Sequence, residues 1–187
     1  DPQKEMQAQR VKNFMNYQIM DQMKEYESDF DQMLFYLPLA GSTFKKVYYD
    51  DLLGRAVSKF VPADDLVVPY TATSLDDAES VIHVVKMSEN ELRKQMVSGF
   101  YSDIELTKPT DTNTNELKEK EREVEGVTKS QRTEPLYTIL ECHVNLDLEG
   151  FEDLGPDGEP TGIKLPYVVT IEEGSRKVLS IRRNFAP

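Results

Sequence analysis

The sequence predicts an α+β fold: N-terminal amphipathic helices packed on a small antiparallel sheet, a further helix, and then a second small antiparallel β unit. Two patterns lead to this prediction. Between residues 3 and 37, apolar side chains recur three and four positions apart, as on one face of a helix. From residue 44 onward, β-branched and aromatic runs are separated by turns rich in Gly and Pro. At 187 residues the chain can bury a core as one domain or as two small ones.

Two helices are expected before the first strand. The first spans about residues 3–26, and its apolar face carries Val11, Phe14, Met15, Ile19, Met23 and Tyr26. Its methionines could form an adaptable binding surface, but we interpret them as gap-filling core; they are Met6, Met15, Met20 and Met23.

The second helix is expected to use Ser28 or Asp29 as its N-cap and to end near Pro38, before a left-handed turn at Gly41. Its apolar residues are Phe30, Met33, Leu34 and Leu37. Because the two helices are amphipathic and closely joined, we expect them to pack against each other and to cover the strands that follow.

A β-hairpin is predicted in the run FKKVYYDDLLGRAVSKFVPADDLVVPY. Gly54 supplies the positive φ of its turn, and Pro62, which cannot donate to a ladder, ends its second strand or places that strand at an edge. Residues 66–68 are expected to add a third short strand to this sheet. The predicted core residues are Phe44, Val47, Phe60 and Val67. On this prediction, Phe60→Ala costs about 3–5 kcal/mol.

Residues 71–80 are expected to form a loop or a single helical turn, with Ser74 as a cap. The strand that follows, 81–85, has the continuous apolar character of a strand buried on both faces. His83 lies within it. No second His or Cys follows at the spacing of a metal site, so we interpret it as a hydrogen-bonded strand histidine in preference to a ligand or base.

A capping box, Ser88 with Glu91 three residues later, marks the start of the next helix. This helix should pass through Leu92 and Met96 and stop at Gly99. The segment 107–134 is then dominated by Thr, Asn, Lys and Glu. A helix over 115–125 is supported by Glu and Lys pairs three and four apart. It is either a solvated helix or a linker that orders only against a neighbouring subunit.

Antiparallel strands are again predicted in the last third of the sequence. A strand covers 136–148, a turn-rich loop covers 149–162, and a hairpin joins 167–171 to 178–181 with Gly174 at its bend. Arg182 and Arg183 are expected to leave the sheet. We therefore divide the chain into a helical and hairpin region at 1–106, the charged segment at 107–134, and a small antiparallel β unit with its own core at 135–187.

The composition limits the functions that the chain could have. The formal net charge is −12, which argues against tight sequence-general DNA binding, whereas an acidic channel lets DNA slide without adhering. No apolar run reaches spanning length and no signal-peptide pattern is present, so membrane insertion and secretion are not expected. The single cysteine, Cys142, excludes an internal disulfide and is interpreted as a small buried residue in preference to a reactive thiol.

The sequence contains acidic and basic clusters that could serve as binding sites. The pairs 50–51, 64–65 and 76–77 place neighbouring Asp carboxylates on opposite sides of the backbone, so turn and cap roles are favoured over metal binding. The stretch 153–159 resembles a calcium loop only in composition. The basic candidates are interpreted as solvated faces or subunit salt bridges in preference to DNA contacts; they are Lys45, Lys46, Arg55, Lys59, Arg176, Lys177, Arg182 and Arg183.

No phosphate-binding loop, nucleophile elbow or set of paired zinc ligands stands in the sequence. The sequence therefore predicts no catalytic residue, no cofactor site and no metal site, and we expect a protein that is not an enzyme.

The ordered combination of several segments resembles the portal (head-to-tail connector) proteins of short-tailed bacteriophages. These segments are Gly41-Ser42 before FKKVYYD, the hairpin into SKFVPADDLVVPY, then IHVVKMSENELRK, LYTILECHVNLDLEG and PYVVTIEEGSRKVLSIRRN. The resemblance extends from about Val11 to Asn184 and weakens from about Lys108 to Glu134. Portal subunits are longer than this chain, which has no initial Met and ends at Pro187, so the resemblance implies a fragment.

The resemblance implies a structural subunit of a twelve-subunit ring at one capsid vertex, through which DNA is packaged and ejected. The implied partners are other copies of the subunit, the terminase large subunit, and capsid, scaffold and tail or head-completion proteins. DNA would pass through without sequence-specific contact, and no membrane is involved. The implied location is the virion, with the host cytoplasm during assembly.

Two other classes of function stay open. The first is an acidic adaptor that binds one partner protein without forming a ring, and images of rings would separate it from a portal. The second is a metal-dependent hydrolase that uses scattered acidic residues, which a calcium or manganese titration followed by thermal shift would reveal.

Overall fold

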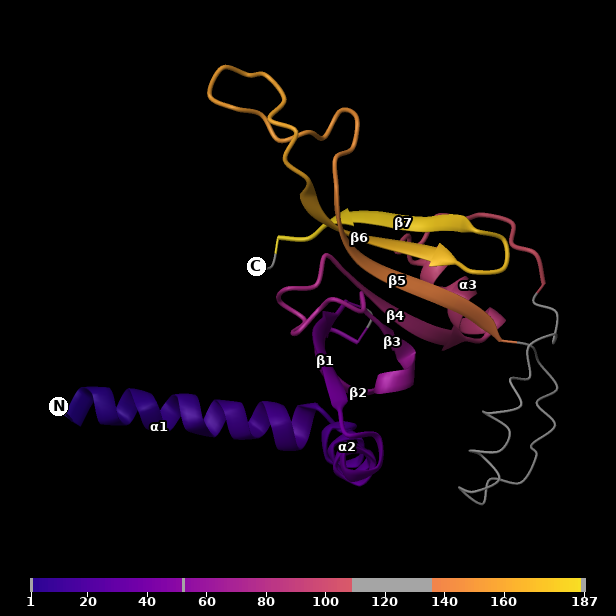
Figure 1. Ribbon diagram of the computed structural model, residues 1–187. Helices are drawn as coiled ribbons and strands as arrows, with labels where there is room; N and C mark the ends of the chain where they lie inside the picture. Colours follow the sequence, from indigo (N-terminus) through magenta and orange to yellow (C-terminus); the bar gives the residue numbers. More distant parts are fainter. Residues whose placement is uncertain (1, 52, 109–135, 186–187) are drawn as a thin grey trace. The chain divides into compact units, whose positions relative to one another are not determined.

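The computed structural model describes residues 2–51, 53–108 and 136–185. It confirms the α+β class, with helices near the N-terminus and two antiparallel sheets (Figure 1). The chain divides into two compact units, residues 1–66 and residues 67–187, which we call unit 1 and unit 2 and describe separately. Within the described residues, no helix has the length and apolar character needed to cross a membrane.

Unit 1 contains helices and one hairpin. Its elements are α1 (Pro2–Tyr17), the π-helical turn η1 (Gln18–Gln22), α2 (Tyr26–Ala40), β1 (Thr43–Asp50), β2 (Arg55–Pro62) and the 3-10 turn η2 (Ala63–Asp65). The single helix expected over 3–26 is thus interrupted. Gly41 has φ +76° and its N–H bonds to the Leu37 carbonyl, which confirms the expected end of α2.

The start of α2 differs from the prediction because its acidic side chains have other partners. The helix begins after Glu25, and neither Ser28 nor Asp29 is its N-cap. The Asp29 carboxylate instead accepts the backbone N–H of Phe60 in β2 at 3.0 Å. The cap residue Glu25 is bound to Arg55 through both carboxylate oxygens, each at 2.8 Å. Tertiary bonds therefore replace the expected local cap.

The hairpin forms as predicted. β1 and β2 pair antiparallel from Thr43 opposite Pro62 to Asp50 opposite Arg55. Gly54 has φ +62°, its N–H bonds to the Asp50 carbonyl, and an Asp50 side-chain oxygen accepts the N–H of Leu53 at 3.0 Å. The sheet is two-stranded, so the expectation that residues 66–68 would join it is wrong.

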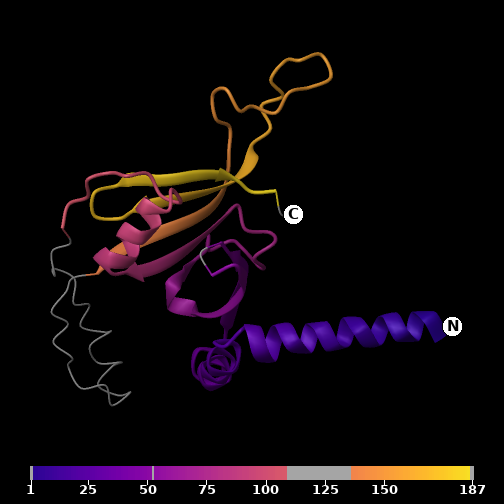
Figure 2. The same cartoon turned by 180° about the vertical axis from the view of Figure 1, so that it is seen from behind.

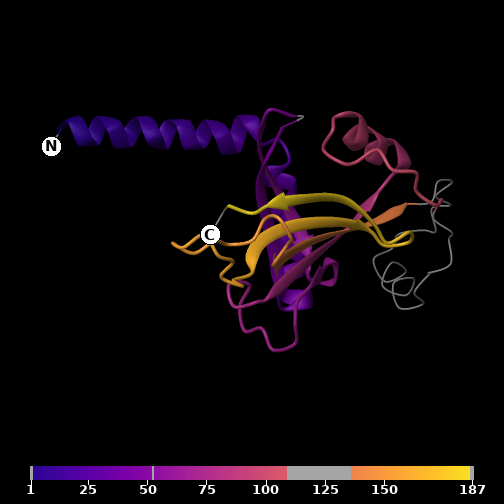
Figure 3. The same cartoon turned by 90° about the horizontal axis from the view of Figure 1, so that it is seen from above.

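The predicted packing of unit 1 is wrong in two respects. α1 has no buried side chain and extends away from α2 and the hairpin, as Figure 3 shows, while α2 packs on β2 through a Tyr36–Phe60 ring contact of 5.5 Å. The methionines expected in the core are therefore largely at the surface, with Met6, Met15 and Met20 between 51% and 76% exposed.

The four predicted core residues are not buried either, since Val47 and Val67 are exposed and Phe44 and Phe60 are half-buried; Val57 and Val61 are buried instead.

Unit 2 is organised around one antiparallel sheet of five strands with one helix. Its elements are β3 (Leu66–Val67, at the boundary with unit 1), β4 (Ser80–Met87), α3 (Glu89–Val97), β5 (Tyr137–Leu146), β6 (Leu165–Glu172) and β7 (Lys177–Arg183), and the strand order is β3-β4-β5-β6-β7. β4 pairs with β5 in the register Val85 opposite Ile139. The expected division at 106 and 135 therefore separates strands that the structure joins. β4 is half-buried along most of its length, so its predicted burial on both faces is also wrong.

α3 covers one face of this sheet, as Figure 2 shows. The capping box is confirmed: the Ser88 hydroxyl accepts the Glu91 N–H at 3.3 Å, and the Glu91 carboxylate accepts the Ser88 N–H at 3.0 Å. Below the helix lies a core in which buried side chains from α3, the following loop, β5 and β7 meet; they are Leu92, Met96, Tyr101, Tyr137, Ile139 and Leu179.

A second buried cluster, Cys142, Tyr167 and Val169, comes from β5 and β6 and confirms that Cys142 is a buried residue. The β6–β7 hairpin has its positive φ at Arg176 and not at Gly174. The buried Glu172 carboxylate holds this turn by accepting the N–H groups of Gly174 and Ser175 at 2.9 and 2.6 Å. Arg182 and Arg183 belong to β7, contrary to the expectation that they leave the sheet.

The remaining expectations concern loops. Residues 149–162 form the predicted turn-rich excursion, closed by an isolated bridge between Leu154 and Pro160. The loop after β3 confirms the role of Ser74, whose hydroxyl accepts the N–H of Asp77. Residues 109–135 lie outside the described part of the chain, so the helix expected over 115–125 and the two interpretations of 107–134 stay predictions.

Candidate functional site

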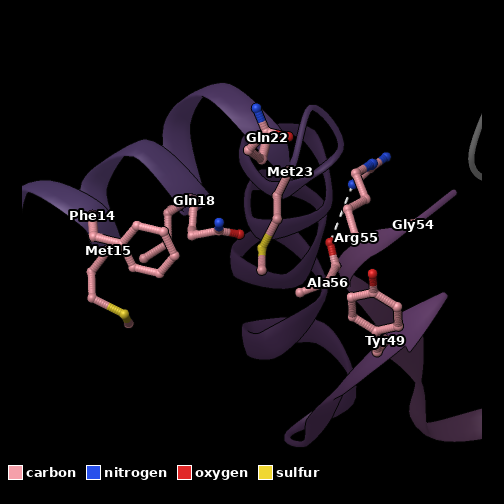
Figure 4. A pocket seen from close by; sticks show the side chains of 10 residues that line it. Phe14, Met15, Gln18, Gln22, Met23, Tyr49, Gly54, Arg55 and Ala56 are labelled. Carbon is pink, nitrogen blue, oxygen red and sulfur yellow. Dashed lines mark hydrogen bonds between the residues drawn. The ribbon is translucent and has the colours of Figure 1, made fainter. Parts of the chain in front are cut away.

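Unit 1 contains an apolar groove, which we call the groove (Figure 4). Its volume is about 570 Å³. It is lined by Phe14, Met15, Gln18, Ile19, Gln22, Met23, Tyr49, Gly54, Arg55 and Ala56. Residues from α1, η1 and the hairpin, distant in the sequence, thus contribute to one surface.

The local structure explains how these side chains converge. α1 ends at Tyr17 and continues into η1, whose wider π-helical turn breaks the regular helical spacing before Met23. On the other side, Tyr49 and Ala56 are directly opposed in the hairpin register, so both lie on one face of the two strands. Gly54 comes from the turn that joins the two strands, and Arg55 is the first residue of β2.

One ion pair fixes the polar edge of the groove. The Arg55 guanidinium binds both oxygens of Glu25, and each of the two side chains is 22% exposed. The hydrogen bond from Arg55 lowers the pKa of Glu25 below its ordinary value, and the same bond raises the pKa of Arg55. Arg55 also donates to the carbonyl of Ala56, the bond drawn in Figure 4. The charge of Arg55 is therefore balanced within the chain.

The lining suits the binding of an apolar side chain of another polypeptide. Met15, Met23 and Phe14 contribute thioether and aromatic groups to the lining, and the amides of Gln18 and Gln22 add hydrogen-bonding capacity. Methionine adapts its shape to a partner, which suits a contact surface. Sequence reasoning missed this site because it assigned the same residues to an internal core.

Exposed apolar side chains also lie on both helices of unit 1. We define the α1 stripe as Val11, Phe14 and Met15, which are 61%, 58% and 51% exposed. We define the α2 outer face as Asp31, Phe35 and Leu39, of which Phe35 is 64% and Leu39 71% exposed. Contiguous exposed apolar side chains are the usual mark of a surface that binds another molecule.

A polar row crosses the sheet of unit 2. His83, Glu141, Thr170 and Ser180 are directly opposed on β4, β5, β6 and β7. His143, two residues along β5 from Glu141, contacts its carboxylate at 3.0 Å, and the Ser180 and Thr170 hydroxyls bond at 3.2 Å. Both histidines of the chain therefore share one face. Sequence reasoning missed this because it did not pair β4 with β5.

The acidic candidates have the turn roles that were favoured. The carboxylate of Asp77 accepts the Thr73 hydroxyl at 3.0 Å, and that of Asp153 accepts the Thr161 hydroxyl at 2.8 Å. Asp64 and Asp65 lie in the short turn η2. In the parts of the chain that the structure describes, no three His, Cys, Asp or Glu side chains are gathered so as to hold a metal ion.

Several basic candidates contact aromatic rings of their own unit. The Lys45 ammonium lies 3.8 Å from the centre of the Tyr26 ring. The Arg182 guanidinium lies 3.5 Å from the centre of the Phe100 ring and donates to the Phe100 carbonyl at 2.8 Å. These contacts stabilise loops and helices against the strands.

The sequence matches no protein-family model, and no curated protein is significantly similar to it.

Proposed function

We propose that this chain acts as a structural subunit of a phage portal ring, the channel at one capsid vertex through which DNA is packaged and ejected. The observation that carries the proposal is the apolar surface of unit 1, where the α1 stripe, the groove and the α2 outer face lie exposed. Exposed apolar surface of this kind usually marks a site that binds another molecule, which in this proposal is a neighbouring subunit. The ordered sequence resemblance to portal proteins supports the same assignment.

The mechanism is geometric and electrostatic. Subunits that associate through two different surfaces form a closed ring when the rotation that relates neighbours, repeated a whole number of times, adds up to a full turn. The net charge of −12 would repel the phosphate backbone and so allow DNA to slide through without sequence-specific contact. In this proposal, exposed loops bind the terminase large subunit during packaging and tail factors afterwards. The subunit carries out no chemical step itself.

An acidic adaptor that binds one partner protein is the second candidate. The same exposed side chains and the same negative charge favour it, because a methionine-containing groove suits a partner's apolar side chain. The two candidates differ in assembly: the adaptor stays a single copy, whereas the portal subunit binds further copies of itself.

Imaging separates these candidates. Protein expressed from the complete reading frame that encodes this sequence would be examined by negative-stain electron microscopy. We expect rings with a central hole. Particles that are single copies at every concentration would contradict the portal proposal and favour the adaptor.

A further inference from the structure

Two helices of unit 1 expose apolar surface and carry opposite charge. α1 has three basic side chains, Lys4, Arg10 and Lys12, against one acidic side chain, Glu5, a net charge of +2. The whole chain has a net charge of −12, so α1 is a basic segment of an acidic protein. α2 has three acidic side chains and no basic one, a net charge of −3. A complementary surface for α1 is therefore present on the same protein.

The apolar and charged side chains are arranged on matching faces. Lys4 stands seven residues before Val11 and eleven before Met15, so it shares the face of the α1 stripe. On α2, Asp31 stands four residues before Phe35 and eight before Leu39, which also places all three on one face. Each helix thus combines an apolar line with a charge at one end.

Other aromatic side chains of α2 already have partners within unit 1. Tyr26 and Phe30 lie against the Lys45 ammonium of β1, and Tyr36 packs on Phe60 of β2. Phe35 and Leu39 remain 64% and 71% exposed, and the Phe35 ring meets the Tyr36 ring edge-on, with their centres 5.7 Å apart. The α2 outer face is therefore available to a second molecule, as is the α1 stripe.

We propose that the α1 stripe of one copy packs on the α2 outer face of a second copy. Lys4 of α1 would lie toward Asp31 of α2, and Phe35 and Leu39 of the second copy would lie along the α1 stripe, whose Phe14 and Met15 also line the groove. Because the two surfaces differ, every pair leaves one α1 stripe and one α2 outer face uncovered, and further copies add in the same way. The inference rests on the proposed function, for which it names the contact between ring neighbours.

The first test compares single substitutions by sedimentation velocity over a concentration series. Phe14→Glu and Phe35→Glu place a carboxylate on each surface, and each is expected to weaken self-association at least about tenfold. Phe151→Glu is the matched control, because Phe151 lies in a loop of unit 2 and is 71% exposed. Self-association that is unchanged in both variants, or weakened equally in the control, would overturn the inference. Melting temperatures confirm that each variant folds.

Two further measurements test whether these two surfaces pair with each other. Mixing Phe14→Glu with Phe35→Glu is expected to restore a dimer and nothing larger, since each variant retains the surface that the other lacks. No restored dimer would refute a contact between these two surfaces. For the unmodified protein, self-association is expected to weaken from low to high salt, because opposite charges attract across the contact. Association that is insensitive to salt would contradict the charge pairing.

The outcomes also separate this inference from the proposed function. If protein from the complete reading frame forms rings and both variants form them equally well, the contact is wrong and the portal proposal stands. If the unmodified protein forms no rings but open chains that both variants abolish, the contact is right and the portal proposal is wrong.

Discussion

Replacement of Leu179 tests whether unit 2 has a single core. Leu179 in β7 is fully buried among side chains of α3, the loop after it and β5. Leu179→Ala removes three carbon atoms, a loss of about 2.4 kcal/mol at roughly 0.8 kcal/mol for each buried methylene, and the residual cavity brings the total to about 3–4 kcal/mol. Ile181→Ala is the matched control, since Ile181 lies in the same strand and is 51% exposed; we expect it to cost no more than about 1 kcal/mol.

Hydrogen exchange followed by mass spectrometry measures this loss in each segment. If α3 and β4–β7 open together, Leu179→Ala accelerates exchange by at least about a hundredfold both in α3 and in β5–β7. Unchanged exchange in α3, with acceleration confined to 137–183, would refute the shared core and favour a boundary near residue 135. Equal effects of Ile181→Ala would refute the assigned burial.

Three further predictions concern single contacts. Ser88→Ala removes the capping box and is expected to lower the stability of α3 by about 1 kcal/mol, measured as faster exchange over 89–97, whereas Ala at the exposed Ser102 should leave this exchange unchanged. Because Arg55 lowers the pKa of Glu25 below 4.5, the ion pair contributes stability above pH 4.5 that is lost as the pH falls through the lowered value. Acid unfolding monitored by circular dichroism should therefore depend less on pH in Glu25→Gln, and an unaltered profile would contradict the contribution. Burial raises the pKa of the Cys142 thiol, so alkylation near pH 8 should be slow in the folded protein and rapid in urea; equal rates would contradict the burial.

Features that depend on neighbouring residues could be predicted from the sequence. The capping box at Ser88 and Glu91 is complete within four positions, and the hairpin turn depends on Gly54 and its nearest neighbours. The class of the fold follows from such local patterns, because helical and strand periodicities are readable without knowledge of tertiary contacts.

Features that depend on residues far apart in the chain could not be predicted from the sequence. β4 and β5 are separated by about fifty positions, and no local pattern specifies that Val85 lies opposite Ile139. The start of α2 depends on Arg55 and on the Phe60 N–H, thirty and thirty-one residues away from their partners. The polar row of His83 and Glu141 was missed for the same reason.

The candidate site was missed for a different reason. Apolar spacing on α1 shows that Val11, Phe14 and Met15 share a face, but the same spacing serves a helix that packs inside its own chain and one that packs on a second molecule. Only the exposure of these side chains distinguishes the two cases. The periodicity was therefore read correctly, and the burial of this face within the chain was predicted wrongly.

The most direct test of the central claim is native mass spectrometry of the protein from the complete reading frame. The portal proposal predicts one closed assembly of uniform copy number, twelve if the resemblance holds. The inferred contact predicts in addition that this assembly is lost in Phe14→Glu and Phe35→Glu and kept in Phe151→Glu. A protein that remains a monomer across all accessible concentrations would contradict the claim that this chain is built to assemble with copies of itself.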